Sequence, residues 1–290
     1  MKIAVVIVLY NPSAEQIDRI CNNAEISNAL FVVVDNSIES HSRSFPDSVL
    51  YVPNYCNLGI ATAQNIGVLK ASEHRCTHVC FFDQDSGIVE GFIDTMYNEY
   101  VRLSKSYPNL FILGPRVCNE KTGVEYKSVI HKEHYSDIGF QKKREIISSG
   151  SITSINLLKE VGLMDETLFI DYVDFELCWR ANQKQYICGI TDAVCLNHNV
   201  GRNTLYLGNY LIIISSPFRY FYQYRNYLWL IRRKYVPLQW KINTGVKYVL
   251  RLVYFPIFIK NGCRIAKYMI KGFLAGLIQS KDDRSNNSFI

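Results

Sequence analysis

Residues 2–35 read KIAVVIVLYNPSAEQIDRICNNAEISNALFVVVD and contain two apolar runs, 2–10 and 29–35, on either side of a more polar stretch. Both runs are rich in β-branched residues, which is typical of parallel strands buried on both faces. Between them, apolar side chains recur every three or four residues, and Ser13 with Gln16 three positions later matches a capping box. The segment therefore predicts a strand, a helix and a second strand parallel to the first.

The same alternation continues as far as residue 85. Residues 49–52 and 78–82 predict two further short strands, and residues 60–71 predict a helix between them. Such alternation is typical of a doubly wound α/β sheet, in which ligands bind beyond the carboxyl ends of the strands. Candidate site residues are therefore those that follow each strand.

The composition is that of a globular chain with one large domain and an appendage. The chain has 290 residues, of which 48% are hydrophobic and 20% charged, so a mainly disordered or collagen-like protein is excluded. Charge is distributed unevenly, because residues 1–205 carry a net charge of −6 and residues 206–290 one of +12. This asymmetry predicts a domain of residues 1–205 and a C-terminal region of residues 206–290 with different partners.

The nine cysteines form no Cys-x-x-Cys pair, so we expect reduced thiols and a cytoplasmic protein. The first apolar run leads into Asn11-Pro12 rather than a small-residue cleavage site, so we expect a strand there and not a signal peptide. His74, Cys76, His78 and Cys80 alternate along an incipient strand, which is not the spacing of a structural zinc site.

Polar residues follow each expected strand, namely Tyr10 and Asn11, Asp35, residues 54–57, and Asp83 with Asp85. Asp35 has two interpretations. It can be a structural residue of a turn, because Asp, Asn and Ser side chains hydrogen-bond the backbone where a strand ends. It can also hold a nucleotide base or ribose, and its place beside a strand-to-helix turn favours that role.

Asp83 and Asp85 place two carboxylates two residues apart at the end of an apolar strand. Oxygen ligands of this kind suit Mg²⁺ or Mn²⁺ bridging a diphosphate. The alternative is a solvated turn, since Asp-x-Asp is a short and common pattern. Burial of the preceding residues 79–82 would fix the pair at the edge where a nucleotide is expected, which favours the metal site.

Residues 169–180, FIDYVDFELCWR, bring three acids and one arginine into an aromatic and apolar segment. Because burying an unpaired charge is costly, a purely structural role would require a partner for each of these groups. Arg180 can pair with one of the acids. A helix that begins near Asp174 would place that carboxylate at its N-terminus, where it either caps the helix or faces a cleft. We favour the cleft.

Taken together, these motifs resemble the family 2 glycosyltransferases of the GT-A fold, especially the bacterial rhamnosyltransferase-like branch. The matching pieces span residues 1 to about 205 and are VIVLYNP (6–12), VDNS (34–37), NLGIA (57–61) with NIG (65–67), FDQD (82–85), SGS (149–151) and residues 171–180. Many relatives carry Glu-Asp at the position of the catalytic base, whereas this chain has Val173-Asp174, so Asp174 occupies the base position. The Gln-x-x-Arg-Trp motif of the processive synthases is not evident, which favours transfer of a single sugar.

The resemblance implies a GT-A domain, a Rossmann-like fold that binds a nucleotide-diphosphate sugar. It implies that Asp174 takes the proton of the acceptor hydroxyl, which attacks the anomeric carbon with inversion, and that a metal neutralises the leaving diphosphate. The remaining roles that it implies are donor binding by Tyr10, Asn11, Asp35, Asn65 and Asp83, binding of Mg²⁺ or Mn²⁺ by Asp85 and His198, and acceptor binding or positioning by Ser149, Gly150, Asp171, Glu176 and Arg180.

Two of these residues have alternatives. Relatives often carry a histidine at the position of His198 that faces the metal or the diphosphate, but a lone histidine after an apolar strand is commonly a hydrogen-bonded structural residue. Ser149 invites comparison with a nucleophilic serine, yet the Gly-x-Ser-x-Gly elbow is missing. We therefore expect residues 149–151 to form an acceptor-site loop.

The C-terminal region interleaves aromatic and aliphatic residues with Arg and Lys, as in residues 218–225 and 227–235, and no stretch is long and apolar enough to span a bilayer. Basic helices with aromatic anchors match a helical region that lies on an anionic membrane surface. The alternatives are a helical subdomain packed on the first domain and a nucleic-acid-binding surface. We favour the membrane and expect no nucleic-acid partner.

The sequence thus predicts a cytoplasmic glycosyltransferase, peripheral on the inner face of the bacterial cell membrane. We expect it to move one sugar, rhamnose from dTDP-rhamnose by resemblance, to a lipid-linked oligosaccharide of O-antigen or a related surface polysaccharide such as lipopolysaccharide. The alternatives are the same chemistry with a UDP- or GDP-linked sugar, and a catalytically silent nucleotide-binding scaffold protein whose carboxylates serve as turn and capping residues.

Overall fold

The computed structural model describes residues 2–119, 136–198, 204–207 and 210–278. The chain divides into two compact units. The N-terminal unit comprises residues 1–169 and 173–201, and the C-terminal unit comprises residues 170–172 and 202–290. The tripeptide Ile170–Tyr172 therefore belongs to the C-terminal unit, although the chain immediately before and after it belongs to the other.

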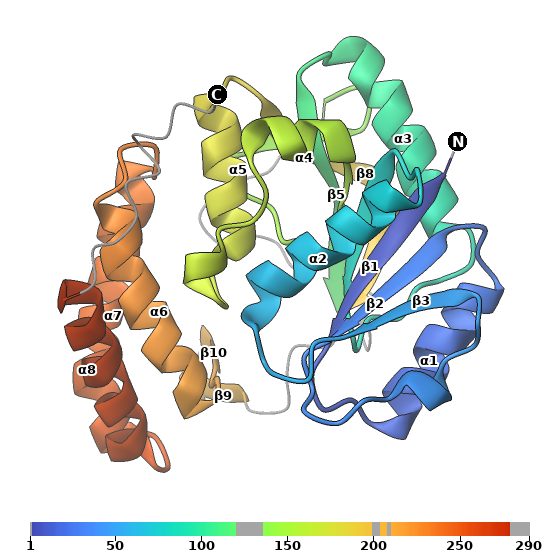
Figure 1. Ribbon diagram of the computed structural model, residues 1–290. Coiled ribbons are helices and arrows are strands. Elements are labelled where there is room, and N and C mark those ends of the chain that lie inside the picture. The colour runs from blue at the N-terminus through green and yellow to red at the C-terminus, as the bar shows by residue number, and fades with distance from the viewer. Residues whose placement is uncertain (1, 120–135, 199–203, 208–209, 279–290) are drawn as a thin grey trace. The chain divides into compact units, whose positions relative to one another are not determined.

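Within the described residues, the N-terminal unit is built on an eight-stranded sheet of order β3-β2-β1-β4-β7-β5-β8-β6 (Figure 1). The strands are β1 (Ile3–Leu9), β2 (Leu30–Asp35), β3 (Val49–Pro53), β4 (His78–Asp83), β5 (Leu110–Asn119), β6 (Phe140–Lys143), β7 (Ile152–Ser154) and β8 (Ile187–His198). Strands β1 to β4 are parallel, whereas β7 runs antiparallel between β4 and β5. The four strands expected up to residue 85 are confirmed to within one residue at each end.

Helices cover both faces of the sheet, as expected for a doubly wound fold. They are α1 (Ala14–Glu25), α2 (Gly59–Glu73), α3 (Phe92–Ser106), α4 (Ile155–Val161) and α5 (Val173–Gln183), with short 3₁₀ helices η1 (Ser42–Ser44) and η2 (Glu166–Leu168). Ile7 of β1 belongs to one core cluster with Ile20 of α1 and Met96 of α3. Val6 points the opposite way and contacts α2 so closely that a Cβ at Gly67 would lie 2.3 Å from it. The capping box of Ser13 and Gln16 at the start of α1 is confirmed.

The register of the sheet determines which side chains meet at its edge. Leu9, the last residue of β1, pairs with Asp35 of β2, and Val8 pairs with Asp83 of β4. Asp35 pairs in turn with Pro53 of β3. The strands end level with one another, so the polar residues that follow them gather at one edge, as the sequence predicted.

One expectation from the cysteines is wrong. Cys118 of β5 and Cys195 of β8 form a disulfide across two paired strands. Spacing along the chain gave no indication of this bond, because 77 residues separate the two cysteines and only the parallel pairing of β5 with β8 brings them together. The other cysteines are free thiols, as expected.

The C-terminal unit consists of helices α6 (Pro217–Ile231), α7 (Leu238–Phe258) and α8 (Gly262–Ile278) and the antiparallel pair β9 (Thr204–Leu207) and β10 (Tyr210–Ile213) (Figure 1). Its core is aromatic, since Tyr220 and Tyr224 of α6 pack with Tyr248 and Phe255 of α7. Two aromatic residues of the run that the sequence favoured as a membrane anchor, Tyr220 and Tyr224, are therefore interior. In the part of the chain that the structure describes, no helix has the length and apolar character needed to cross a membrane.

Candidate active site

Asn36, which follows β2, joins the ends of three neighbouring strands. Its backbone N–H donates to the carbonyl of Leu9 at 2.9 Å, its side-chain amide donates to the carbonyl of Gly59 at 3.0 Å, and its side-chain oxygen accepts from the amide of Asn54 at 2.8 Å. Asn36 is buried. Since buried amides are stable only when hydrogen-bonded, this network fixes the spacing of β1, β2 and β3 where the site begins.

Asp35, the last residue of β2, is buried and only 1% exposed. Its carboxylate accepts hydrogen bonds from the backbone N–H of Ser37 at 2.8 Å and the Tyr51 hydroxyl at 2.6 Å, and its Oδ2 lies 2.7 Å from Nδ1 of His41. Burial acts to raise the pKa of Asp35, but hydrogen bonds from Ser37, Tyr51 and His41 outweigh it and hold the pKa below its ordinary value. The carboxylate therefore organises the end of β2 from below.

Tyr10 and Asn11 form the rim of the site at the end of β1. The backbone N–H of Tyr10 donates to Oε1 of Gln84 at 2.8 Å, and that of Asn11 donates to Oγ of Ser37 at 2.8 Å. Asn11 has a φ of 47°, a left-handed conformation that Asn tolerates better than most residues. Tyr10 is 51% exposed. The rim thus offers an open aromatic face beside the strand ends.

The Asp83-Gln84-Asp85 segment leaves β4 in a turn held by two serines. The backbone N–H of Asp83 donates to Oγ of Ser86 at 3.2 Å and to Oγ of Ser149 at 3.4 Å, and the two hydroxyls lie 3.0 Å apart. The Asp85 side chain is exposed, while its backbone carbonyl accepts from Arg19 at 2.9 Å. The turn leaves the Asp85 carboxylate directed to solvent at the strand edge.

The Ser149-Gly150 loop lies against the end of β4. Ser149 pairs with Phe81 in an isolated parallel β-bridge, and the N–H of Gly150 donates to the Phe81 carbonyl at 2.7 Å. Gly150 has a φ of 76°, and a Cβ there would lie 2.8 Å from a side-chain carbon of Pro115. Both the conformation and the space require glycine, so the loop is held in one place.

Asp174, in the first turn of α5, meets the same loop from the other side. Its Oδ2 accepts from the backbone N–H of Ser148 at 3.3 Å, and its Oδ1 accepts from the N–H of Phe175 at 2.9 Å. Burial raises the pKa of Asp174 to about 6, against these backbone hydrogen bonds, and the negative charge of Asp83 raises it further. Ser148 and Ser149 therefore bring the end of β4 close to the start of α5. The carboxylates of Asp83 and Asp174 are near enough for the charge of one to affect the pKa of the other.

The other charges of the 169–180 block are occupied elsewhere. Arg180 makes a bidentate ion pair with the fully buried Glu176, at 2.9 Å for each bond, and donates to the carbonyls of residues 161–163 that end α4. Asp171 belongs to the C-terminal unit, where it pairs with Arg219 at 2.5 Å. The side chains of all three residues are therefore paired, and whether they bind the acceptor or position the site stays a prediction.

Asn65, expected to contact the donor, is buried and holds two segments together. Its side chain donates to the carbonyl of Met164 at 3.0 Å and to Oε1 of Glu166 at 2.8 Å, and accepts from the N–H of Met164 at 2.9 Å. Nearby, the Phe169 carbonyl accepts from the N–H of Ile60 at 2.7 Å, at the start of α2. Asn65 thus supports the approach to the 169–180 block through these bonds, and its contact with the donor stays a prediction.

Several residues at the site were not assigned from the sequence. Ser148 bonds Asp174, Ser86 accepts from the backbone of Asp83 in the turn after β4, and His41 and Tyr51 bond Asp35. Ser148 contacts Asp174 through a backbone N–H, which no residue type can reveal. A serine three residues after Asp83 is the one detectable pattern among them, because Ser side chains commonly bond a nearby backbone in turns.

The part of the chain that the structure describes contains no preassembled metal cage. Among the described side chains, no three acidic, histidine or cysteine groups are close enough to form a metal cluster. The oxygen donors of Asp83 and Asp85 still fit Mg²⁺ or Mn²⁺, which proteins commonly hold by one or two carboxylates together with substrate phosphates. His198 is the last residue of β8, and its side chain lies outside the described part of the structure, so its role as a ligand stays a prediction.

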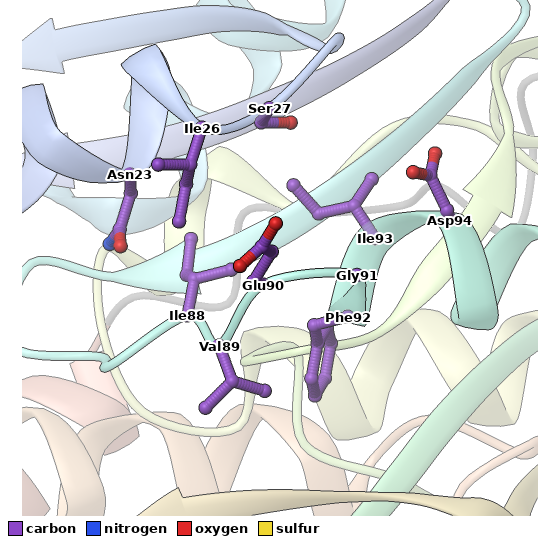
Figure 2. A pocket seen from close by; sticks show the side chains of 10 residues that line it. All are labelled: Asn23, Ile26, Ser27, Ile88, Val89, Glu90, Gly91, Phe92, Ile93 and Asp94. Carbon is purple, nitrogen blue, oxygen red and sulfur yellow. The ribbon is translucent and has the colours of Figure 1, made fainter.

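A shallow pocket elsewhere on the N-terminal unit is distinct from this edge. Figure 2 shows it between Asn23, Ile26 and Ser27 at the end of α1 and residues 88–94, which lead into α3. The side-chain amide nitrogen of Asn23 is buried there without a hydrogen-bond partner. None of the residues assigned to donor, metal or base lines this pocket.

Comparison with known proteins gives two curated relatives. No family model matches the chain. The dTDP-rhamnosyl transferase RfbF of Shigella flexneri is 31% identical over 294 residues, which covers 95% of this chain and 94% of RfbF. The low-salt glycan biosynthesis hexosyltransferase Agl10 of Haloferax volcanii is 25% identical over 190 residues, and the match spans 59% of each protein.

Solved structures share the fold at low sequence identity. The structure of GalNAc-T7 with UDP, GalNAc and Mn²⁺ has a TM-score of 0.57 at 13% identity, and the match covers 93% of this chain and 55% of that one. Residues 1–349 of S. aureus TarS give a TM-score of 0.51 at 14% identity, covering 95% and 81% of the two chains. At such identities the likeness shows the fold alone.

Proposed function

Because the chain belongs to the GT-A glycosyltransferase family that includes the dTDP-rhamnosyl transferase RfbF, we propose that it transfers one rhamnose from dTDP-rhamnose to a lipid-linked oligosaccharide. The product would enter O-antigen or a related surface polysaccharide. That the chain is a nucleotide-sugar glycosyltransferase of polysaccharide biosynthesis follows from the relatives. The donor sugar, the lipid on the acceptor and a place on the inner face of the cell membrane are the proposal.

The observation that carries the proposed mechanism is the junction between β4 and α5. Ser149 bonds the backbone of Asp83, and the adjacent Ser148 bonds the carboxylate of Asp174. A donor held at the end of β4 and an acceptor hydroxyl at Asp174 would therefore lie side by side. This is the arrangement that a direct displacement requires, because the attacking oxygen and the anomeric carbon must start in contact.

In the proposed reaction Asp174 is the general base. Its carboxylate takes the proton of the acceptor hydroxyl, and the acceptor oxygen forms a bond to the anomeric carbon. The bond from that carbon to the diphosphate oxygen breaks, and its electron pair leaves with the nucleoside diphosphate. A pKa of about 6 suits this role, since Asp174 is ionised at neutral pH yet more basic than an ordinary carboxylate.

The donor would occupy the edge formed by β1, β2 and β4. The exposed Tyr10 ring offers a face on which a base can stack, and Asn11 lies beside it. Asp83 would bind the donor and Asp85 would hold a divalent cation together with the diphosphate. The cation, when bound, would supply positive charge against the charge that develops on the leaving group. Asp35 would support the binding of the nucleotide base indirectly. It accepts from the N–H of Ser37, whose hydroxyl accepts from the N–H of Asn11.

A second candidate is the same chemistry with another donor sugar. The relative Agl10 is described as a hexosyltransferase, and a structural neighbour holds UDP and GalNAc. None of the residues at this edge distinguishes the sugars, so a panel of donors is required.

The test is release of nucleoside diphosphate from dTDP-rhamnose, UDP-sugars and GDP-sugars, with membrane extract as the acceptor source and with Mg²⁺, Mn²⁺ or EDTA. We expect turnover of dTDP-rhamnose that EDTA abolishes. Turnover of a UDP- or GDP-sugar instead would contradict the assigned donor. Nucleotide binding without turnover of any donor would overturn the proposed activity and favour a silent nucleotide-binding protein.

A further inference from the structure

Helix α7 carries an apolar stripe that the C-terminal unit leaves uncovered. Leu238, Ile242, Val249, Leu250, Val253 and Ile257 belong to it, and their exposures lie between 56% and 70%. At about 100° per residue these positions fall within an arc of about 120° on one side of the helix. The stripe runs nearly the whole length of α7, about 30 Å for 21 residues.

The opposite side of α7 is already used. Tyr248 and Phe255 pack with Tyr220 and Tyr224 of α6 in the core of the unit, and the ring of Tyr224 stacks on that of Tyr248 with centroids 4.3 Å apart. The helix is therefore apolar on two sides, and only one of them is buried within the unit. A continuous exposed apolar surface of this length is uncommon on monomers and marks an interaction site.

Helix α8 repeats the pattern with cations along its margin. Ile270 and Leu274 are 50% and 51% exposed, and Lys267 and Lys271 are exposed beside them. Lysines in this position can extend their charged ends toward a polar boundary while their methylene chains cover apolar surface. Both helices thus have the character of helices that lie in a membrane interface.

The charge of the region decides between possible occupants. Residues 217–278 contain twelve Lys and Arg and no Asp or Glu. A second copy would present the same excess of positive charge, so association of two such faces would be opposed by repulsion. An anionic lipid surface complements it, since each cation near such a surface contributes about 1 kcal/mol.

We propose that the apolar stripe of α7 lies in the interface of an anionic membrane, with the cations of the C-terminal unit facing the lipid headgroups. The inference deepens the proposed membrane location, on which it rests, by assigning the contact to α7. It also departs from the sequence-based expectation, because the run of residues 218–225 has Tyr220 and Tyr224 in the interior of the unit and not at the surface.

The test compares two double variants of the full chain. Val249→Ser with Val253→Ser lowers the hydrophobicity of the stripe without changing charge, and Val and Ser have similar helix propensities. Leu69→Ser with Val101→Ser is the matched control, because those apolar side chains are 46% and 36% exposed on the N-terminal unit. Binding is measured by co-sedimentation with phosphatidylcholine vesicles, with and without phosphatidylglycerol.

We expect the wild-type chain and the control to bind vesicles that contain phosphatidylglycerol, and high salt to weaken this binding. The stripe variant should lose at least about tenfold in affinity for these vesicles. Equal binding by the stripe variant and the control, or no binding by the wild-type chain, would overturn the proposal. A dimer that the stripe variant abolishes, without vesicle binding, would assign the stripe to a second copy instead.

Nucleoside diphosphate release in detergent separates this proposal from the proposed function. The stripe variant should release nucleoside diphosphate at the wild-type rate when the acceptor is dissolved. Vesicle binding without turnover of any donor would contradict the enzymatic proposal alone, whereas turnover without vesicle binding would contradict the membrane proposal alone.

Discussion

At the scale of single residues, the proposed mechanism assigns most of the chemistry to Asp174. It lies at the start of α5 with its carboxylate between the backbone N–H groups of Ser148 and Phe175. Burial and the neighbouring Asp83 raise its pKa to about 6. The same environment that makes the carboxylate a better base also makes its charged form costly to the fold. Activity and stability should therefore respond in opposite directions to its removal.

The pH dependence of turnover follows from this pKa. Since the base must be ionised, kcat/KM should rise with pH, with one proton lost and a midpoint near 6. Glu73→Gln is the control, because that carboxylate is exposed and pairs with Lys70 on α2, so its loss should leave the midpoint unchanged. A profile that is flat from about pH 5 to pH 8 would contradict the assignment of the base.

The stability effect has a definite sign. The pKa of Asp174 is higher in the folded chain than its ordinary value of 3.8, so the folded state binds the proton more tightly and loses stability as pH rises from about 4 to 6. Asp174→Asn should therefore raise the free energy of unfolding at about pH 7.5, by on the order of 1–2 kcal/mol, and much less at about pH 4. Urea denaturation at the two pH values measures this. A variant that is less stable than wild type at the higher pH would show that burial does not disfavour the charged form of the Asp174 carboxylate.

At the scale of elements, the loop before β7 joins β4 to α5 and depends on Gly150. Gly91, the N-cap of α3, has the same φ of 76° but open space around it. Gly150→Ala and Gly91→Ala should share a backbone cost of about 1 kcal/mol, and Gly150→Ala should cost about 1–3 kcal/mol more because it clashes with Pro115. Only Gly150→Ala should also lower kcat. Equal losses in both variants, measured by urea denaturation, would mean that the loop adjusts freely.

The buried pair of Arg180 and Glu176 ties α5 to the end of α4. Arg180→Met leaves the fully buried Glu176 without its partner and should cost about 3–5 kcal/mol. Arg102→Met is the comparison, since Arg102 makes a similar bidentate pair with Glu99 at a more exposed site and should cost about 1 kcal/mol or less. Thermal unfolding of both variants provides the measurement, and a loss at Arg180 no larger than that at Arg102 would contradict a structural role for this pair.

Most of the elements that build the site were predictable because their signals are local. The strands β1 to β4, the helix α1 with its capping box and the start of α5 near Asp174 all follow from periodicity and end residues. The disulfide of Cys118 with Cys195 was not predictable, because it depends on the pairing of β5 with β8. The same holds for Asn65, whose partners Met164 and Glu166 are about one hundred residues away.

At the scale of the whole molecule, the chain joins a mainly acidic α/β unit to a basic helical one. Composition predicted a division near residue 205 with opposite net charges on its two sides. It did not reveal which apolar residues form the interior of the helical unit. Apolar residues recur on two sides of α7, so the sequence pattern alone does not show which side is buried. The packing of Tyr248 and Phe255 identifies the buried side, and the other side is exposed. Nor did composition indicate that residues 170–172 would join the C-terminal unit.

The most direct test of the account is the turnover of Asp174→Asn with the donor that the wild-type chain accepts, measured beside its affinity for the corresponding nucleoside diphosphate. The account predicts a loss of kcat of about a hundredfold or more with nucleotide affinity unchanged, because the variant keeps the donor edge and loses the base. Turnover within about threefold of wild type would contradict the central claim that Asp174 removes the proton of the acceptor.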